Sequence, residues 1–369
     1  MKVRLWVLLL GIGLLSPLIG VKAESYAKDS IEIAQNTFRE AEFERANQLY
    51  HQGTKLYQQG KHIQTISIFE EILEIYRYLH KEDHPDIALS LNNLAFIYQF
   101  QGRYEAAEPL LQDALAMMKR LFSNDHPDVA LSLGNLSALY YLQGRYEAAE
   151  PLLQDSLAMY QRLFPRDHPD VAFSLNSLAA LYKSQGRYAD AESLYNQALA
   201  MRKRLYQVDH PDVASSLNNL AALYQDQGRY RKAESFHKEA LAISQRLFSE
   251  DHPDVARSLN NLAGLYQAQG RLAEAESLYK EALAIWQRLF SGDHPDVARS
   301  LSNVGLFYQA QAQYLDALNY LAQAAEVQEA ILSENLVIGS EQQKKQFLDL
   351  FQNNTDSTIS FHLQRIVGL

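Results

Sequence analysis

The chain has 369 residues, of which 47% are hydrophobic and 21% are charged, and its formal net charge is −10 at pH 7. This composition is typical of folded proteins and excludes wholesale disorder. The acidic balance argues against a nucleic-acid partner, which would need a basic surface. The absence of cysteine excludes disulfides, zinc–thiolate sites and cysteine nucleophiles.

Residues 1–23 have the pattern of a signal peptide. Lys2 and Arg4 form a short basic region, an apolar run follows from Leu5 to Leu15, and a small-x-small cleavage motif ends at Ala23. The alternative is an uncleaved anchor, which would place only this segment in a membrane. Its apolar run is shorter than the roughly 20 residues of a spanning helix. We therefore expect cleavage near Ala23 and an exported protein, periplasmic or extracellular.

A 42-residue period organises the chain between residues 45 and 332. The tripeptide His-Pro-Asp recurs six times without insertion, beginning at His84, His126, His168, His210, His252 and His294. A fixed period of this length is typical of a solenoid, in which each repeat contacts only its neighbours. Residues 24–44 are expected to form a helical lead-in. Residues 333–369 break the period and are expected to form a tail or capping segment.

Each repeat is predicted to contain two helices joined by a tight turn. Apolar residues at helical spacing indicate a first helix, helix A: Leu91, Leu94, Ala95 and Tyr98. Gly102 ends this helix, and a second stripe indicates helix B: Ala107, Leu110, Leu111, Ala114 and Leu121. His-Pro-Asp supplies a cap, a proline at the first helical position and a carboxylate near the helix start. The sequence therefore predicts an all-α protein of about seven hairpins.

This pattern of leucine, alanine and tyrosine resembles the tetratricopeptide repeat. The 42-residue period, with its HPDVA and SLNNLA segments, is similar to the kinesin light chain type of that family. The resemblance covers roughly residues 45–332. It implies a right-handed superhelical solenoid whose A helices line a concave groove.

The tail resembles a different kind of segment. Its sequence SENLVIGSEQQKKQFLDLFQNNTDSTISFHLQ is similar to the connector that precedes CHAT peptidase-like domains in bacterial proteins. Such a domain needs several hundred further residues and a His/Cys pair, which this chain does not contain. The resemblance implies either a protein that has lost its enzyme domain or one that works with an enzyme on another chain.

Asparagine recurs on helix A, although its side chain competes with the helical backbone. The residues are Asn92, Asn93, Asn135, Asn176, Asn218, Asn219, Asn260, Asn261 and Asn303. The family resemblance implies that they face the groove and hydrogen-bond the backbone of an extended peptide, because an amide offers both a donor and an acceptor. The alternative is that they tie neighbouring repeats together. We expect the peptide-binding role, and a single asparagine can serve both roles.

A second column on helix A changes from apolar to basic along the chain: Leu89, Leu131, Phe173, Ser215, Arg257 and Arg299. Arginine binds carboxylates in a bidentate manner, so Arg257 and Arg299 suit an acidic ligand. Our hypothesis is a ligand segment with an apolar part and an acidic part. The alternative is a solvated face whose composition has drifted between repeats.

Signatures of catalysis are missing from the sequence. There is no Walker loop, dinucleotide glycine fingerprint, HExxH or GxSxG motif. Successive repeats stack roughly 10 Å apart, so the six repeated histidines cannot converge on one zinc ion, whose ligand nitrogens lie about 2 Å away. We expect no metal, no cofactor and no small-molecule substrate.

The function that we expect is a non-catalytic scaffold that binds a protein or peptide in its groove. The alternative is an accessory subunit that recruits substrate to a peptidase or envelope assembly whose enzyme is on another chain. Self-association through the exposed ends or the tyrosine-rich faces is a further expectation.

Overall fold

The computed structural model describes residues 17–248, 251–290 and 292–338, with side chains described between residues 36 and 331 of these ranges. In this part of the chain there are fourteen helices and no strand. They pair in chain order as α1 (Pro17–Gln58) with α2 (His62–Leu79), α3 (Pro85–Phe100) with α4 (Tyr104–Leu121), α5 (Pro127–Leu142) with α6 (Tyr146–Leu163), α7 (Pro169–Ser184) with α8 (Tyr188–Leu205), α9 (Pro211–Asp226) with α10 (Tyr230–Leu247), α11 (Pro253–Ala268) with α12 (Leu272–Leu289), and α13 (Pro295–Ala310) with α14 (Tyr314–Ile338). The odd-numbered helices are the A helices, and the predicted all-α superhelical solenoid of about seven hairpins is confirmed.

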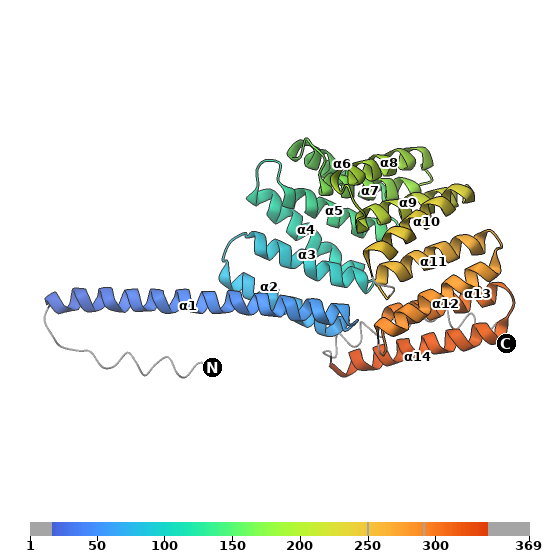
Figure 1. Ribbon diagram of the computed structural model, residues 1–369. Coiled ribbons are helices and arrows are strands. Elements are labelled where there is room, and N and C mark those ends of the chain that lie inside the picture. The colour runs from blue at the N-terminus through green and yellow to red at the C-terminus, as the bar shows by residue number, and fades with distance from the viewer. Residues whose placement is uncertain (1–16, 249–250, 291, 339–369) are drawn as a thin grey trace.

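The first helix is longer than the repeat requires. α1 runs without a break from Pro17 to Gln58, so the lead-in predicted at residues 24–44 is continuous with the first A helix. Its N-terminal half extends beyond the stacked hairpins (Figure 1). Residues 1–16 of the predicted signal peptide and 339–369 of the predicted tail lie outside the described residues. None of the helices that the structure describes is both long enough and apolar enough to span a membrane.

His-Pro-Asp starts every A helix after the first with the same cap. The histidine Nδ1 accepts a hydrogen bond from the backbone N–H of the aspartate two residues on, at 3.1–3.3 Å, and proline occupies the first turn. In five of the six repeats, the histidine ring also stacks on an aromatic residue at the end of the preceding B helix: Phe122, Phe164, Tyr206, Phe248 and Phe290. The predicted helix-start role of His-Pro-Asp is therefore confirmed.

One continuous core runs through the hairpins. Ala95, Ala107 and Ala114 are completely buried where α3 and α4 meet, and their small side chains let the two backbones approach closely. Leu91 is 2% exposed and fills the remaining space. The turn between the two helices passes through Gly102 at φ +71°, a conformation that glycine adopts without a steric cost.

Neighbouring repeats are joined by three side chains that we call the Glu–Arg–Tyr clamp. In one example, the Arg229 guanidinium lies over the Tyr224 ring at 4.4 Å and donates to Glu192 of the preceding repeat at 3.0 Å. The Tyr224 hydroxyl donates to the same carboxylate at 2.8 Å. The equivalent arginine–glutamate bonds are Arg145–Glu108, Arg187–Glu150 and Arg271–Glu234. These clamps account for the tyrosine and the arginine that recur at these positions in the five middle repeats.

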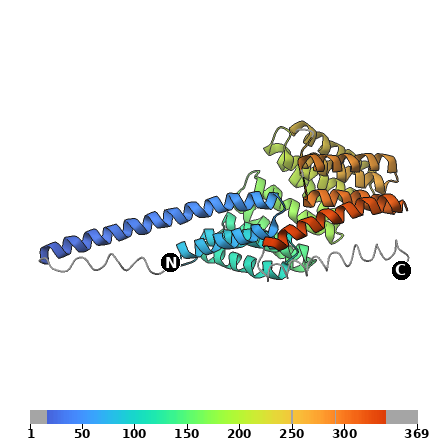
Figure 2. The same ribbon diagram turned by 90° about the horizontal axis from the view of Figure 1, so that it is seen from below.

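The curvature brings the first and last repeats together. His294 Nε2 lies 3.1 Å from the carbonyl oxygen of Gln58, and Pro295 packs directly over Gly60. α14 also contacts α2, and the two helices lie at the facing ends of the arch (Figures 1 and 2). The seven hairpins therefore form a closed arch, which the sequence did not predict.

Candidate functional site

The A helices gather on the inner side of the arch. Neighbouring A helices contact one another directly, α3 with α5, α7 with α9 and α9 with α11. No consecutive B helices in the described ranges are in comparable contact. Neighbouring A helices lie closer together than neighbouring B helices, so the chain curves toward the A helices. The exposed side chains of the A helices therefore line the concave face.

The predicted asparagines form two adjacent columns along this face. Asn219 Nδ2 donates to Asn176 Oδ1 at 2.9 Å, and Asn303 Nδ2 donates to Asn260 Oδ1 at 2.9 Å, so each bond joins two neighbouring A helices. Asn92 is buried, and its Nδ2 lies 3.5 Å from Ser132 Oγ of the next repeat. The role of tying repeats together therefore has direct contacts for these five asparagines.

The remaining asparagines are placed differently. Asn218 Oδ1 lies 2.8 Å from Nδ1 of His237 on the partner helix of the same hairpin. Asn93, Asn135 and Asn261 make no side-chain hydrogen bond with any described residue, and they are at least partly exposed on the concave face. Their amides are available to a ligand, so a contact with a peptide backbone stays a prediction.

An apolar pocket of about 210 Å³ lies between α5, α6 and α7. Leu131 and Phe173 line its mouth and are 41% and 61% exposed. Gly134 stands where other repeats carry a column asparagine, and a Cβ there would have only Ser156 Oγ as a neighbour, at 3.8 Å. The missing side chain opens the space, and Tyr160 of α6 forms part of its wall.

A polar pocket of about 350 Å³ lies between α11, α12 and α13. It is lined by seven residues, five of which belong to the predicted site: Arg257, Asn260, Asn261, Trp286, Arg299, Ser300 and Asn303. The Arg257 and Arg299 side chains are 58% and 60% exposed, and each pairs with an aspartate one turn earlier on its own helix, Asp254 or Asp296. The two arginines can therefore exchange an exposed intramolecular partner for a ligand carboxylate.

One position on the B helices, which was not predicted from the sequence, contributes a residue to each pocket. In successive repeats it is occupied by Met118, Tyr160, Arg202, Ser244 and Trp286, all of which are buried. Tyr160 and Trp286 line the two pockets. The residue at this position differs among these five repeats within an otherwise regular 42-residue pattern, and that variation could have identified it.

Arg202 is a buried cation without a carboxylate bound to it. Its side chain is 5% exposed, and its Nη1 donates to the carbonyl of Asp212 at 2.9 Å and to Ser216 Oγ at 2.7 Å. Burial lowers the pKa of this guanidinium, and its Nε has no hydrogen-bond partner. Arg202 therefore places a buried positive charge where α8 packs against α9, in the part of the chain between the two pockets.

Comparisons with known proteins agree with this architecture. A tetratricopeptide repeat family model matches residues 44–120, 86–162, 128–204, 212–285 and 254–330, and a second tetratricopeptide repeat model matches residues 176–247. A search of curated proteins gives no match.

Several solved structures share the fold. BtubC (BKLC) from P. vanneervenii is 26% identical over 63% of this chain and 92% of its own, with a TM-score of 0.50. Aspartyl phosphate phosphatase F from Bacillus subtilis is 15% identical over 81% of this chain and 74% of its own, with a TM-score of 0.58. The Rap conjugation gene regulator of plasmid pLS20, solved in complex with the Phr* peptide, is 13% identical over 78% of this chain and 75% of its own, with a TM-score of 0.56. With family matches that run through all seven hairpins, the chain belongs to the tetratricopeptide repeat family.

Proposed function

We propose that this protein is a non-catalytic scaffold that binds an extended peptide or protein segment along the concave face of its A helices. The observation that carries the proposal is the pair of pockets on that face, one apolar around Leu131 and Phe173 and one polar around Arg257 and Arg299. Solenoids of this family offer long concave surfaces for binding. A Rap regulator of the same fold was solved with a bound peptide, which supports a peptide ligand.

The pockets define the chemistry of the ligand. An apolar side chain suits the pocket at α5–α7, and an acidic side chain or a terminal carboxylate suits the arginines at α11–α13. The two pockets are three repeats apart, so at a stacking distance of roughly 10 Å they are separated by about 30 Å. An extended chain rises about 3.3 Å per residue, so a segment of about nine residues would reach both pockets.

The asparagines would act on the ligand backbone from positions at the two pockets and on α3 beside the first of them. The free amides of Asn93, Asn135 and Asn261 each carry a donor and an acceptor that can pair with a peptide unit of any sequence. Asn176 and Asn219 hold each other and are proposed to keep the groove rigid. A rigid groove lowers the entropy lost on binding.

The test uses residues 24–369 as bait, followed by cross-linking to locate the captured partner. We expect the double variant Arg257→Ala/Arg299→Ala to lower the affinity of that partner about tenfold or more and to weaken its salt dependence. The matched control Lys119→Ala/Arg231→Ala removes two exposed cations from B helices and should leave affinity unchanged. Equal affinity in all three proteins, or cross-links only on B helices, would contradict the proposal.

We also propose that the scaffold acts after export, because residues 1–23 have the pattern of a cleaved signal peptide. N-terminal sequencing of the protein from fractionated cells should begin near Glu24. The accessory-subunit alternative rests on the resemblance of the tail to a CHAT connector. It would be favoured if the cross-linked partner carried a peptidase domain.

A further inference from the structure

The cap at the start of α3 differs from the other five in one residue. Where the later repeats place an aromatic ring against the cap histidine, this repeat has His80. The His80 ring stacks on the His84 ring with centroids 3.3 Å apart and planes 5° from parallel. A second imidazole therefore occupies the place of Phe122 or Phe164 without disturbing the packing of the loop.

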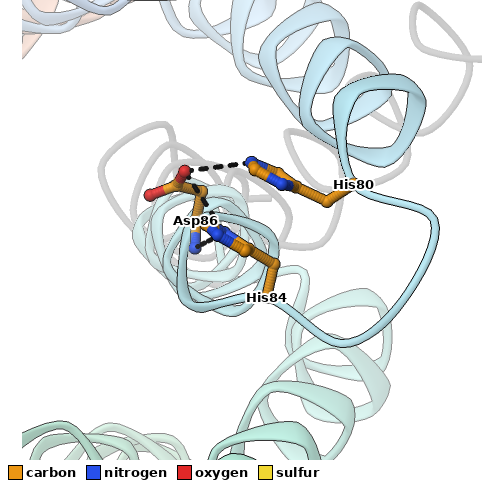
Figure 3. Close-up of side chains that lie close together, drawn as sticks. All are labelled: His80, His84 and Asp86. Carbon is orange, nitrogen blue, oxygen red and sulfur yellow. Dashed lines mark hydrogen bonds and ion pairs between the residues drawn. The ribbon is translucent and has the colours of Figure 1, made fainter.

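Both imidazoles turn a nitrogen toward the same carboxylate oxygen (Figure 3). His80 Nε2 lies 3.2 Å from Asp86 Oδ2, and His84 Nδ1 lies 3.3 Å from the same atom. One ligand atom from each of the three residues lies within 4.8 Å of the others, and all three residues are half-buried. Ligand atoms about 2.0–2.1 Å from a tetrahedral zinc ion lie about 3.3 Å apart. Two of the three separations already have this value.

We propose that His80, His84 and Asp86 bind a divalent transition-metal ion of the zinc type. The ion would take the place of the proton shared between the His80 imidazole and the Asp86 carboxylate. Imidazole and carboxylate together suit zinc, whereas magnesium and calcium prefer oxygen ligands. Three protein ligands leave one coordination position for water or for a side chain of a partner.

The surroundings of the cluster set the expected affinity. His84 Nδ1 also accepts the Asp86 backbone N–H at 3.2 Å, so metal binding competes with one cap bond. The Arg39 guanidinium, held by the carbonyl of Leu79 at 3.0 Å, is a neighbouring positive charge. We therefore expect micromolar rather than nanomolar binding.

The test is calorimetric titration of the untagged full chain with zinc chloride at pH 7.5. The wild-type protein should bind one zinc ion at this site, and His80→Phe should weaken that binding at least tenfold. Phenylalanine occupies the equivalent position in most later repeats, so the His80→Phe variant should fold normally. Circular dichroism without metal should therefore match that of the wild type. No zinc binding by the wild type, or equal binding by the variant, would overturn the proposal.

A gain of function tests whether the three residues are sufficient. Phe122 stacks on His126 at 3.5 Å, and His126 Nδ1 lies 3.6 Å from Asp128 Oδ2, so Phe122→His would build the same cluster one repeat later. The variant should bind one zinc ion more than the wild type. Cobalt absorption should report tetrahedral coordination at both sites. Unchanged stoichiometry would contradict the assignment of the site to these three residues.

Discussion

At the scale of single residues, the turn inside each hairpin needs a left-handed conformation. Gly144 adopts it at φ +71° and Gly270 at φ +74°, whereas the last repeat has Ala312 at φ +59°. A Cβ in this region costs roughly 1 kcal/mol. We predict that Ala312→Gly raises the free energy of unfolding by about 1 kcal/mol, measured by urea denaturation. An unchanged or lower value would contradict the assigned strain.

A buried histidine makes stability depend on pH. His237 of α10 is 2% exposed, and burial lowers its pKa from 6.5 to about 4. The unfolded chain therefore binds more protons than the folded chain between these values. The contribution of His237 to the free energy of unfolding is therefore fully present above about pH 6.5 and is lost as the pH falls toward 4.

The substitution His237→Tyr tests this dependence, because Tyr195 and Tyr279 occupy the same position in neighbouring repeats. Between pH 6.5 and pH 4, the free energy of unfolding should fall less in the variant than in the wild type. We predict that the difference between the two decreases is up to about 3 kcal/mol. Burial also lowers the pKa of His62 to about 4. The stability of the variant should therefore still depend on pH, because His62 is unchanged. The measurement is urea denaturation at a series of pH values, and identical slopes for both proteins would rule out this role of His237.

Local features of single residues could be predicted from the sequence, and their distant partners could not. The helix caps at His84 and at the equivalent histidines can be predicted from the His-Pro-Asp tripeptide alone, and the turn at Gly102 can be predicted from its glycine. The bond between Asn176 and Asn219 depends on how one helix rotates against the next. The same holds for His80, whose place beside Asp86 depends on the path of the loop.

At the scale of helices, the Glu–Arg–Tyr clamp should stabilise each junction more than an ordinary surface ion pair. Arg229 and Glu192 are 39% and 29% exposed, and Tyr224 contributes both a ring beneath the guanidinium and a hydroxyl bond to the carboxylate. A cation over an aromatic ring adds about 0.5–1 kcal/mol at such sites. The three contacts converge, so their energies should be coupled.

We predict a coupling energy of about 1 kcal/mol between Arg229→Ala and Glu192→Ala in a double-mutant cycle. The control pair is Lys203 and Glu239, which are 3.0 Å apart, about half exposed and without an aromatic partner. That pair should give a coupling of about 0–0.5 kcal/mol. Equal coupling energies in both cycles would show that Tyr224 does not strengthen the interaction between Arg229 and Glu192.

The helices themselves could be predicted because their boundaries repeat every 42 residues. The pockets between them could be predicted only in part. The column from Leu131 to Arg299 indicated an apolar and a basic region, and the structure places Leu131 and Phe173 at one pocket and Arg257 and Arg299 at the other. The depth of the pockets depends on Gly134 and on B-helix residues such as Tyr160, whose inward direction requires the packing angle of the hairpin.

At the scale of the whole molecule, the arch closes because small rotations between successive repeats add up along the chain. Each repeat is rotated slightly relative to the one before it, and the six rotations between the seven hairpins bring α13 back to the end of α1. His294 has the same tripeptide as the other cap histidines, yet its Nε2 reaches Gln58, 236 residues away. No pattern within one repeat could predict this contact. Closure matters for function because it fixes the curvature of the face that carries both pockets.

Two glycines allow the closing contact to be tested. Gly60 and Gly270 both have φ +74°, but a Cβ at Gly60 would lie 2.7 Å from Pro295 Cδ, whereas one at Gly270 would meet nothing within 4 Å. Both alanine variants should lose roughly 1 kcal/mol to backbone strain. Only Gly60→Ala should also separate the first and last repeats.

Because the chain has no cysteine, spin labels can be attached at two introduced cysteines without interference. Tyr78 of α2 and Leu315 of α14 are 66% and 86% exposed and suit this purpose. We predict that the distance between these labels, measured by pulsed electron resonance, increases in Gly60→Ala and stays at the wild-type value in Gly270→Ala. Equal distances in both variants would mean that the arch does not depend on the packing of Pro295 against Gly60, and that curvature is set entirely within the repeats.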